Sequence, residues 1–218
     1  GQAVAFISGG KEYGVIIAPK HLAFNDTEIN RTGVSVFMTE QQARENELRG
    51  TQAAIEDAGA LGVMTAFNRV GITATNAHTG LLKNILRGEW GFKGLESQDF
   101  IMNPNYAVLK EYALNGGTMT TFTGENTMAA VSEKFAYWTT ENVGQDTELM
   151  SAIKQAMTWQ AYALANSNAM DGMASSTRLV SVRTWYDNAL VAVQVVFAAL
   201  TVLAAAMYVL NDRKSKKQ

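Results

Sequence analysis

A run of 22 residues without a charged side chain, residues 189–210, constrains this chain more than any other feature of its sequence. The only clearly polar members of the run are Gln194 and Thr201. As an α-helix it would be about 33 Å long, which is enough to cross the hydrocarbon core of a bilayer. The alternative, an apolar helix buried in a soluble core, fits this length less well. We therefore expect one transmembrane helix at residues 189–210.

The residues beside this run predict its orientation. Trp185 and Tyr186 precede it and Tyr208 lies near its end, where aromatic side chains favour the membrane–water interface. The tail that follows, residues 211–218, is basic, and basic flanks favour the cytoplasmic side. We expect a single-pass protein of a bacterial cell membrane, with residues 1 to about 185 outside the cell, the tail in the cytoplasm and the lipid bilayer as a partner.

The composition excludes several functional classes. The 218 residues include no cysteine, which excludes disulfides and thiolate metal sites, and only two histidines, which gives a metal centre little support. The formal net charge of −2 argues against a nucleic-acid partner. We expect neither a metal nor a cofactor. The first residues contain no initiator Met and no signal-peptide pattern, so we also expect a fragment of a longer protein.

Short apolar runs alternate with helical stretches before residue 170. Runs at residues 14–18 and 61–67 and the segment that leads to Asp99 are predicted strands, separated by predicted helices at residues 39–57 and 80–88. This alternation predicts α/β structure with parallel βα units, of which about four fit before the apolar run. A closed (β/α)8 barrel needs eight units, so this chain would hold only part of one.

Polar residues follow the predicted strands at the positions where a parallel barrel places its reactive groups. Lys20 and His21 follow the first run, Asn68 follows the second, and Asp99 follows the third. Each has an ordinary alternative explanation, as a solvated strand end or a helix N-cap. Together they predict a site at one rim of the sheet.

Three blocks of sequence resemble a known family. Residues 20–31 read Lys-His-Leu-Ala-Phe-Asn-Asp-Thr-Glu-Ile-Asn-Arg, which resembles the Lys-His-Phe-x-x-Asn-x-x-Glu-x-x-Arg motif of β-glucosidases of glycoside hydrolase family 3 and departs from it only at Leu22. Residues 62–68 resemble that family's Val-Met-x-x-Tyr-Asn strand end. Residues 81–94 resemble its Leu-Leu-x-x-x-Leu-Arg-x-Glu-Trp-Gly-Phe-x-Gly run. The blocks keep the family's order from residue 19 to about residue 100.

The resemblance implies a role for seven residues. Asp99 occupies the position of the catalytic nucleophile, which in a retaining glycosidase forms a covalent glycosyl intermediate while a second carboxyl group acts as acid and base. The other six occupy substrate-binding positions, and charged donors such as Lys and Arg suit the hydroxyls of a sugar. These expected substrate-binding residues are Lys20, His21, Arg31, Met64, Phe67 and Phe100.

Three departures from the family pattern bear on activity. Phe67 replaces a Tyr whose hydroxyl would bond the nucleophile, and Thr118 replaces an Asp in a later turn. Residues 96–98, Glu-Ser-Gln, replace an apolar strand, and a carboxylate buried there would need a partner.

No general acid is identified within the chain. One branch of the family uses a second His shortly after the Lys-His pair, and residues 22–32 contain none. Another branch takes a Glu from an α/β sandwich domain, and the resemblance to members with exchanged domain order places that domain upstream of Gly1. Four glutamates of this chain are expected to be helix-surface charges: Glu125, Glu133, Glu141 and Glu148. His78 is expected on a loop, where it could reach an outer subsite.

The resemblance therefore implies the C-terminal half of a (β/α)8 barrel, followed by helices and one transmembrane helix. The implied activity is retaining hydrolysis of terminal β-glycosidic bonds in β-linked oligosaccharides or glycosides, with this fragment alone inactive. The alternatives are a catalytically impaired sugar-binding pseudoenzyme and a membrane-anchored scaffold. The expected boundaries are 1–169 for the partial barrel, 170–188 for a juxtamembrane linker, 189–210 for the transmembrane helix and 211–218 for the basic tail.

Overall fold

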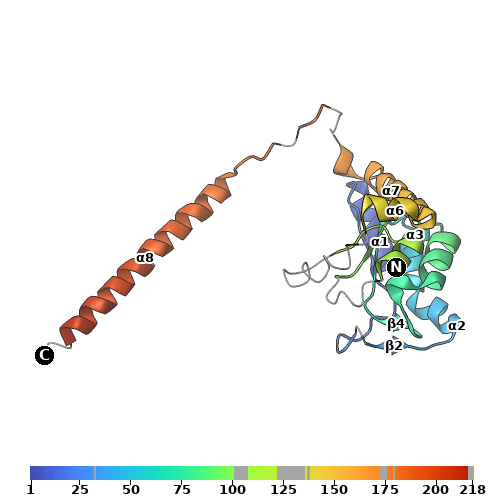
Figure 1. Ribbon diagram of the computed structural model, residues 1–218, viewed down its shortest axis with the longest axis horizontal. Coiled ribbons are helices and arrows are strands. Elements are labelled where there is room, and N and C mark those ends of the chain that lie inside the picture. Colours follow the sequence, from blue (N-terminus) through green and yellow to red (C-terminus); the bar gives the residue numbers. More distant parts are fainter. Residues whose placement is uncertain are drawn as a thin grey trace. The chain divides into compact units, whose positions relative to one another are not determined.

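The computed structural model describes residues 1–31, 33–100, 108–121, 136, 138–171, 176–178 and 180–215. The chain divides into two compact units, Gly1–Gly172 and Met173–Gln218. The first unit mixes helices and strands, and the second contains one long helix, α8 (Trp185–Ser215). Figure 1 shows helices α1, α3, α6 and α7 of the first unit, with strands β2 and β4 at its edge.

The helical elements of the first unit include regular α-helices and shorter 3₁₀ and π segments. In chain order they are α1 (Gln2–Glu12), α2 (Glu40–Gln42), the π-helix η1 (Ala43–Glu47), α3 (Arg49–Glu56), the 3₁₀-helix η2 (Thr75–Ala77), the π-helix η3 (Gly80–Glu89), α4 (Leu109–Leu114), α6 (Thr140–Gln145), α7 (Thr147–Ala165) and the 3₁₀-helix η5 (Asn168–Met170).

The main sheet has three parallel strands in the order β1 (Lys20–Leu22), β3 (Gly62–Thr65) and β6 (Leu95–Gln98). A parallel bridge from Ser97 to Met119 extends the sheet beyond β6. Neighbouring strands thus follow one another in chain order, with helices in the connections. This arrangement brings the carboxyl ends of the strands to the same edge, where a parallel α/β sheet carries its site.

A smaller sheet lies beside the main one. Strand β2 (Ser35–Val36) pairs in parallel with β4 (Arg69–Val70), which pairs antiparallel with β5 (Thr73–Ala74). Strands β4 and β5 lie in the connection that leaves β3, so this small sheet borders the carboxyl end of the main sheet. Figure 1 shows β2 and β4 at the side of the unit away from α6 and α7.

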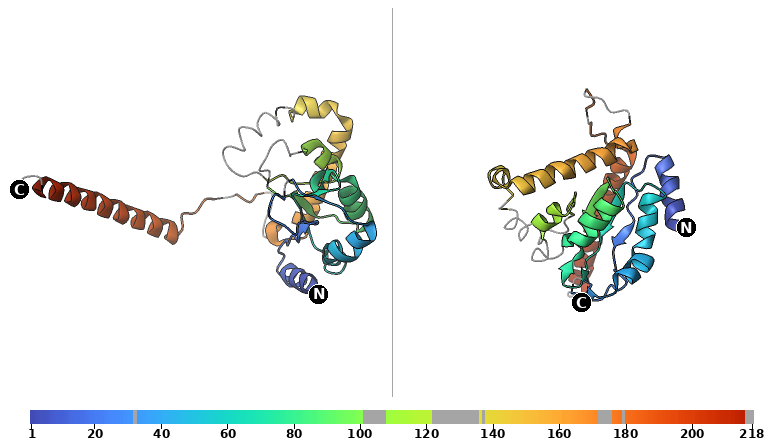
Figure 2. Two further views of the ribbon diagram at one scale, coloured as in Figure 1. Left: turned by 90° about the horizontal axis from the view of Figure 1, so that it is seen from below. Right: turned by 90° about the vertical axis from the view of Figure 1, so that its right-hand side faces the viewer.

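The predicted helix at residues 39–57 is observed as the consecutive segments α2, η1 and α3. It begins with a capping box, in which Thr39 Oγ1 accepts from the Gln42 N–H and the Gln42 side chain accepts from the Thr39 N–H, each at 3.2 Å. It ends before Gly59, whose φ of +63° suits a residue without a Cβ. Helices α1 and α3 pack side by side (Figure 2).

The core lies between the main sheet and its covering helices. Leucines of η3 and Leu48 join Val63 of β3 and the aromatic rings of Trp90 and Phe92 in one buried cluster. Leu82 and Leu86 are almost completely buried, and each such side chain contributes about 1.5–3 kcal/mol through burial. Residues 81–94 therefore form part of the core, and their packing fixes the start of β6.

The expected strand at residues 14–18 is wrong in position. The N–H groups of Gly14 and Val15 bond back to α1, at Lys11 and Gly10, and Gly14 has a φ of +71°, so these residues close the helix. Pro19 has no N–H to give to a ladder. The strand forms at Lys20–Leu22 instead, and Lys20 and His21 lie within β1 rather than after it. The peptide bonds Lys20–His21 and Leu22–Ala23 are cis.

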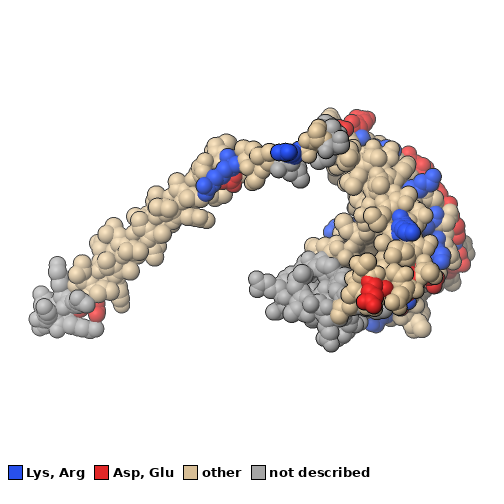
Figure 3. All heavy atoms as spheres, turned by 45° about the horizontal axis from the view of Figure 1, so that its top comes forward, with Lys and Arg blue, Asp and Glu red and all other residues tan. Residues whose placement is uncertain are grey.

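The second unit is described by α8 and the residues before it. The segment Trp185–Asp212 is long and apolar enough to cross a membrane: its most apolar 18-residue window has a mean hydropathy of 2.4, and none of that window is buried in the structure. Figure 3 shows the apolar length of α8 without Lys, Arg, Asp or Glu between its first turns and Asp212. Residues 176–178 and 180–184 form neither helix nor strand. The domain boundaries expected from the sequence stay predictions.

Candidate active site

The carboxyl end of the main sheet gathers several of the predicted site residues. His21 lies on β1, Phe67 follows β3 and Asp99 follows β6 directly. Because the three strands are parallel neighbours, residues from distant parts of the sequence meet at this edge. Asp99 and His21 are in direct contact across the sheet, with 3.2 Å between Asp99 Oδ2 and His21 Nε2.

Both carboxylate oxygens of Asp99 have a neighbour. Oδ1 accepts a hydrogen bond from the backbone N–H of Phe100 at 2.8 Å, and Oδ2 lies against the His21 ring. The Asp99 side chain is 8% exposed and the His21 side chain 17% exposed. The carboxylate is therefore nearly buried and oriented by its own backbone and by β1.

The charge state of His21 is set mainly by burial. Burial lowers the pKa of His21, the positive charges of Lys20 and Arg31 lower it further, and Asp99 and Glu28 act in the opposite direction. A neutral imidazole can carry its proton on Nε2 and offer it to a carboxylate oxygen. His21 is thus suited to donate toward Asp99 at neutral pH.

Arg31 and Phe67 form a second contact among the predicted residues. The Arg31 guanidinium lies over the Phe67 ring, 4.5 Å from its centroid, and Arg31 Nη1 also lies 3.0 Å from Glu28 Oε2. A cation over an aromatic face contributes about 0.5–2 kcal/mol. Phe67 is buried. It lacks the hydroxyl of the family's Tyr, but its ring packs against the Arg31 guanidinium.

The remaining predicted residues line the same strands. Lys20 pairs in register with Met64 of β3; Lys20 is exposed and Met64 is half-buried. Phe100 follows Asp99 and is 45% exposed, as an aromatic side chain that contacts a ligand would be. Asn68, also expected at this rim, is buried, and its Nδ2 donates to the carbonyl of Arg69 at 3.4 Å. The site residues stay predictions, and the structure brings them to one edge.

Glu96 is the departure with the largest electrostatic consequence. Its side chain is completely buried on β6, and neither carboxylate oxygen has a hydrogen-bond partner among the described residues. Burial raises the pKa of Glu96 to about 7, although Tyr112 and Arg87 act to lower it. The Tyr112 hydroxyl donates to the main-chain carbonyl of Glu96, at 2.9 Å, and not to its carboxyl group. The carboxyl group of Glu96 therefore keeps its proton at pH values below about 7.

Thr118, where the family pattern has Asp, bonds to the backbone of Glu96. Its Oγ1 donates to the Glu96 carbonyl at 2.6 Å and accepts from the Glu96 N–H at 2.8 Å. The residue therefore joins the segment at Met119 to β6 and has a structural role.

His78, Glu141 and Glu148 lie outside this site. His78 Nδ1 accepts from the Leu81 N–H at 3.1 Å, so the ring caps the start of η3, and burial lowers the pKa of His78. Glu141 and Glu148 are exposed on α6 and α7, as expected. Glu125 and Glu133 lie outside the described residues. Among the residues that the structure describes, no group of three or more His, Asp or Glu side chains is placed to hold a metal.

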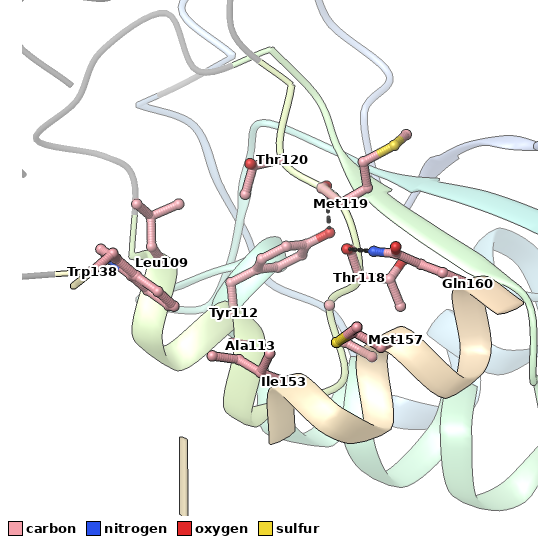
Figure 4. Close-up of a pocket in the computed structure, with 12 residues that line it drawn as sticks. Leu109, Tyr112, Ala113, Thr118, Met119, Thr120, Trp138, Ile153, Met157 and Gln160 are labelled. Carbon is pink, nitrogen blue, oxygen red and sulfur yellow. Dashed lines mark hydrogen bonds between the residues drawn. The ribbon is translucent and has the colours of Figure 1, made fainter. Parts of the chain in front are cut away.

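A cavity of about 300 Å³ lies between α4, α7 and residues 117–120. Figure 4 shows Tyr112 and Gln160 at its wall, bonded to the carbonyls of Met119 and Thr118. Its lining includes none of the seven predicted site residues. The cavity is therefore separate from the Asp99 site.

Comparison with known proteins decides the family. The description "Glycosyl hydrolase family 3 N terminal domain" matches residues 2–111, which is half of the chain. The chain belongs to this family. A probable β-glucosidase J of Emericella nidulans is 39% identical over 99 residues, a match that covers 45% of this chain and 12% of the relative. A β-glucosidase of Rhizobium radiobacter is 37% identical over 98 residues, covering 45% and 12%.

Solved structures share the fold of this family 3 chain. β-Glucosidase 3B from Thermotoga neapolitana, solved in complex with glycerol, superposes with a TM-score of 0.64 at 24% identity, covering 76% of this chain and 23% of that protein. The chain thus spans less than a quarter of the solved relative and about an eighth of the curated ones.

The structure also shows residues of this family 3 chain that the sequence reasoning did not single out. Arg87 donates to the carbonyls of Phe92, Gly94 and Gly116, and its guanidinium lies 3.8 Å from the Trp159 ring centroid. Burial lowers the pKa of Arg87 to about 10. The Leu-Arg-x-Glu-Trp block could have indicated this role, because an arginine inside an apolar run needs buried acceptors. Asn76, which is hydrogen-bonded to Gln98 at 2.7 Å, carried no such signal.

Proposed function

We propose that this chain is part of a retaining β-glycosidase that hydrolyses terminal β-glycosidic bonds of glycosides or β-linked oligosaccharides. The contact between His21 Nε2 and Asp99 Oδ2 at the carboxyl ends of β1 and β6 carries the proposal. Family membership and relatives named as β-glucosidases support the same reaction. The contact supports a role for Asp99 because it orients a carboxylate at the carboxyl end of the sheet, where a parallel α/β barrel carries its reactive groups.

In the proposed mechanism Asp99 attacks the anomeric carbon and the bond to the leaving oxygen breaks. A general acid gives a proton to that oxygen as it leaves. Water then attacks the same carbon, its proton passes to the base, and the ester bond to Asp99 breaks with overall retention. Lys20, His21 and Arg31 would bond sugar hydroxyls, and Met64, Phe67 and Phe100 would contact the ring.

The general acid is proposed to come from outside residues 1–218. The support is that a linker and an apolar helix, rather than an α/β sandwich domain, follow the family 3 blocks, which resembles family members whose sandwich domain precedes the barrel. In this arrangement the present chain supplies the C-terminal half of a (β/α)8 barrel, and an upstream sandwich domain of the same protein is its partner. The parallel order β1-β3-β6 with a further bridge at Met119 is compatible with half of such a barrel.

The helix α8 is proposed to anchor the catalytic part to a bacterial cell membrane. The length and mean hydropathy of Trp185–Asp212 support this. The basic tail favours an orientation with the catalytic part outside the cell.

The test uses the protein that carries residues 1–218, with Asp99→Asn, Asp99→Gly and, as a matched control, Asp26→Asn at an exposed position of the Lys-His block. Both Asp99 variants should lose turnover, and an activated 2-fluoro glycoside should label Asp99 in the wild type. Azide should restore turnover to Asp99→Gly and yield a product of inverted configuration. Labelling of another residue, or an Asp99→Asn variant with near-normal rate, would overturn the assignment.

A second candidate function is sugar binding without turnover. Phe67, which lacks the hydroxyl of the family's Tyr, and the uncompensated carboxyl group of Glu96 favour it. Titration calorimetry with β-glycosides separates the two functions: a pseudoenzyme binds them, shows no labelling at Asp99 and leaves them intact.

A further inference from the structure

The short 3₁₀-helix η2 (Thr75–Ala77) is bonded to the end of β3. The N–H of Thr75 donates to the carbonyl of Asn68 at 3.1 Å, and Thr75 Oγ1 donates to the carbonyl of Ala66. Thr75 is completely buried. The turn is therefore fixed to the segment that carries Phe67.

The next residue of η2 is bonded to the end of β6. Asn76 Nδ2 donates to Gln98 Oε1 at 2.7 Å, and both side chains are buried, at 7% and 2% exposure. Gln98 directly precedes Asp99. The two residues have different neighbours, since Gln98 bonds to η2 whereas Asp99 contacts β1.

A further hydrogen bond joins η2 to α4. Asn115 Nδ2, at the end of α4, donates to the carbonyl of Ala77 at 2.9 Å, and Asn115 is as buried as Asn76. One three-residue turn thus connects the ends of β3, β6 and α4, and only its Asn76 contact reaches the residue beside Asp99.

We propose that Asn76 is a positioning residue which holds Asp99 in place through Gln98. The inference rests on the proposed function for its consequence in catalysis, because there Asp99 is the nucleophile. The backbone between Gln98 and Asp99 transmits the constraint. The hydrogen bond from the Asn76 side chain fixes Gln98, the last residue of β6, and the planar peptide group that follows then limits the direction of the Asp99 side chain.

The energetics favour a rigid pair. Asn76 Oδ1 and Gln98 Nε2 have no hydrogen-bond partner among the described residues, so the 2.7 Å bond between Asn76 Nδ2 and Gln98 Oε1 is the main compensation for burying both amides. Loss of that bond leaves buried polar groups unsatisfied, which makes the end of β6 rearrange. A displacement of about 1 Å at a reacting group can reduce a rate roughly 100-fold.

The first measurement compares Asn76→Ala with Asn115→Ala in the protein that carries residues 1–218. Both substitutions remove one equally buried asparagine that bonds across η2, so their effects on thermal unfolding should be similar. The rate of inactivation by an activated 2-fluoro glycoside should fall about 10- to 100-fold in Asn76→Ala, with little change in the inhibitor concentration for half-maximal rate, and stay within about 2-fold of wild type in Asn115→Ala. Gln98→Ala should match Asn76→Ala, and the double variant should lose no more than either single one.

The second measurement does not depend on catalysis. The ring signals of His21, assigned with His78→Asn, are followed by NMR against pH in the histidine-labelled chain. The charge of Asp99 raises the pKa of His21, so displacement of Asp99 in Asn76→Ala should lower that pKa, whereas Asn115→Ala should not. Equal His21 titrations in wild type, Asn76→Ala and Asn115→Ala would overturn the inference. A shifted titration without any labelling of wild-type Asp99 would keep the positioning role and overturn the proposed function.

Discussion

His21 Nε2 lies 3.2 Å from Asp99 Oδ2, so a histidine of β1 meets a carboxylate at the end of β6 with β3 between the two strands. The other oxygen of Asp99 is held by the Phe100 N–H. Two independent parts of the chain thus orient one carboxyl group. Because the Asp99 side chain is already oriented, it loses little conformational freedom when it attacks a bound substrate, and the barrier to attack is lower.

Substitution of His21 by Asn is expected to lower kcat/KM about 10- to 100-fold. A hydrogen bond to a charged group contributes roughly 1.5–3 kcal/mol, and each 1.4 kcal/mol corresponds to about a factor of ten in rate. Steady-state kinetics with an aryl β-glycoside measure the effect.

The control for His21→Asn is His78→Asn. His78 caps η3 through its contact with the Leu81 N–H, so its loss should lower the unfolding temperature with little change in kcat/KM. A His21→Asn variant as active as wild type would mean that the Asp99 contact has no role in the reaction.

The stability of the first unit should decrease as pH rises from about 4.5 to about 7. Burial raises the pKa of Glu96 from 4.5 to about 7, so within this window the folded state retains a proton that the unfolded state has lost. Stability that is present in full below pH 4.5 is lost progressively as the pH approaches 7, by about 3 kcal/mol in total. Denaturant titrations at several pH values measure the slope.

Glu96→Gln should flatten that slope, because an amide does not ionise. The variant should gain stability relative to wild type at pH 7 and above, and little at pH 4. Glu12→Gln, at an exposed position of α1, is the matched control and should keep the wild-type slope. A wild-type stability that rises between pH 4.5 and 7, with no change in Glu96→Gln, would contradict the buried neutral carboxyl group.

The sequence predicted the elements in which local patterns agree with packing. The capping box at Thr39 and Gln42 marked the start of α2, and leucine spacing at residues 81–86 marked η3, because both depend on neighbours close in the chain. The strand before Asp99 was predicted from its position between Gly94 and a polar residue, although Glu96 and Gln98 give it an unusual composition.

Other features depend on contacts that no local pattern contains. Residues 14–18 are apolar enough for a strand, but the N–H groups of Gly14 and Val15 close α1, and Pro19 has no N–H to donate to a ladder. From the sequence, Gln98 is a departure from an apolar strand. In the structure, the connection that leaves β3 places Asn76 beside Gln98, and the two side-chain amides are hydrogen-bonded. Pairing between distant polar residues requires the fold before it can be inferred.

Residues 1–185 expressed without the rest of the protein are expected to show no hydrolysis above background. The proposed general acid lies outside them, and the main sheet would lack the remaining strands of the barrel. Assays with an aryl β-glycoside test this, and addition of the separately expressed upstream part is the informative companion experiment. Robust turnover by residues 1–185 alone would show that the acid lies within them.

The apolar helix α8 should insert with residues 1–185 outside the cell. The uncharged residues 189–210 of α8 match the bilayer core in length, and four basic residues follow them. Protease added to intact cells should digest the catalytic part and spare the tail after Leu210. Protection of the catalytic part in intact cells, with the tail exposed, would reverse the proposed orientation and require an imported glycoside as substrate.

The charges of the tail should determine this orientation. Neutral substitutions at Arg213, Lys214, Lys216 and Lys217 leave Arg178 and Arg183 as the nearest basic residues, on the other side of the span. Because basic residues are retained on the cytoplasmic side, the variant should insert in mixed orientation, visible as partial protease protection of residues 1–185. Removing Arg178 and Arg183 instead should leave protection of the tail unchanged, since the four basic residues after the helix remain. Uniform orientation after loss of all four tail charges would show that another feature of the chain sets its topology.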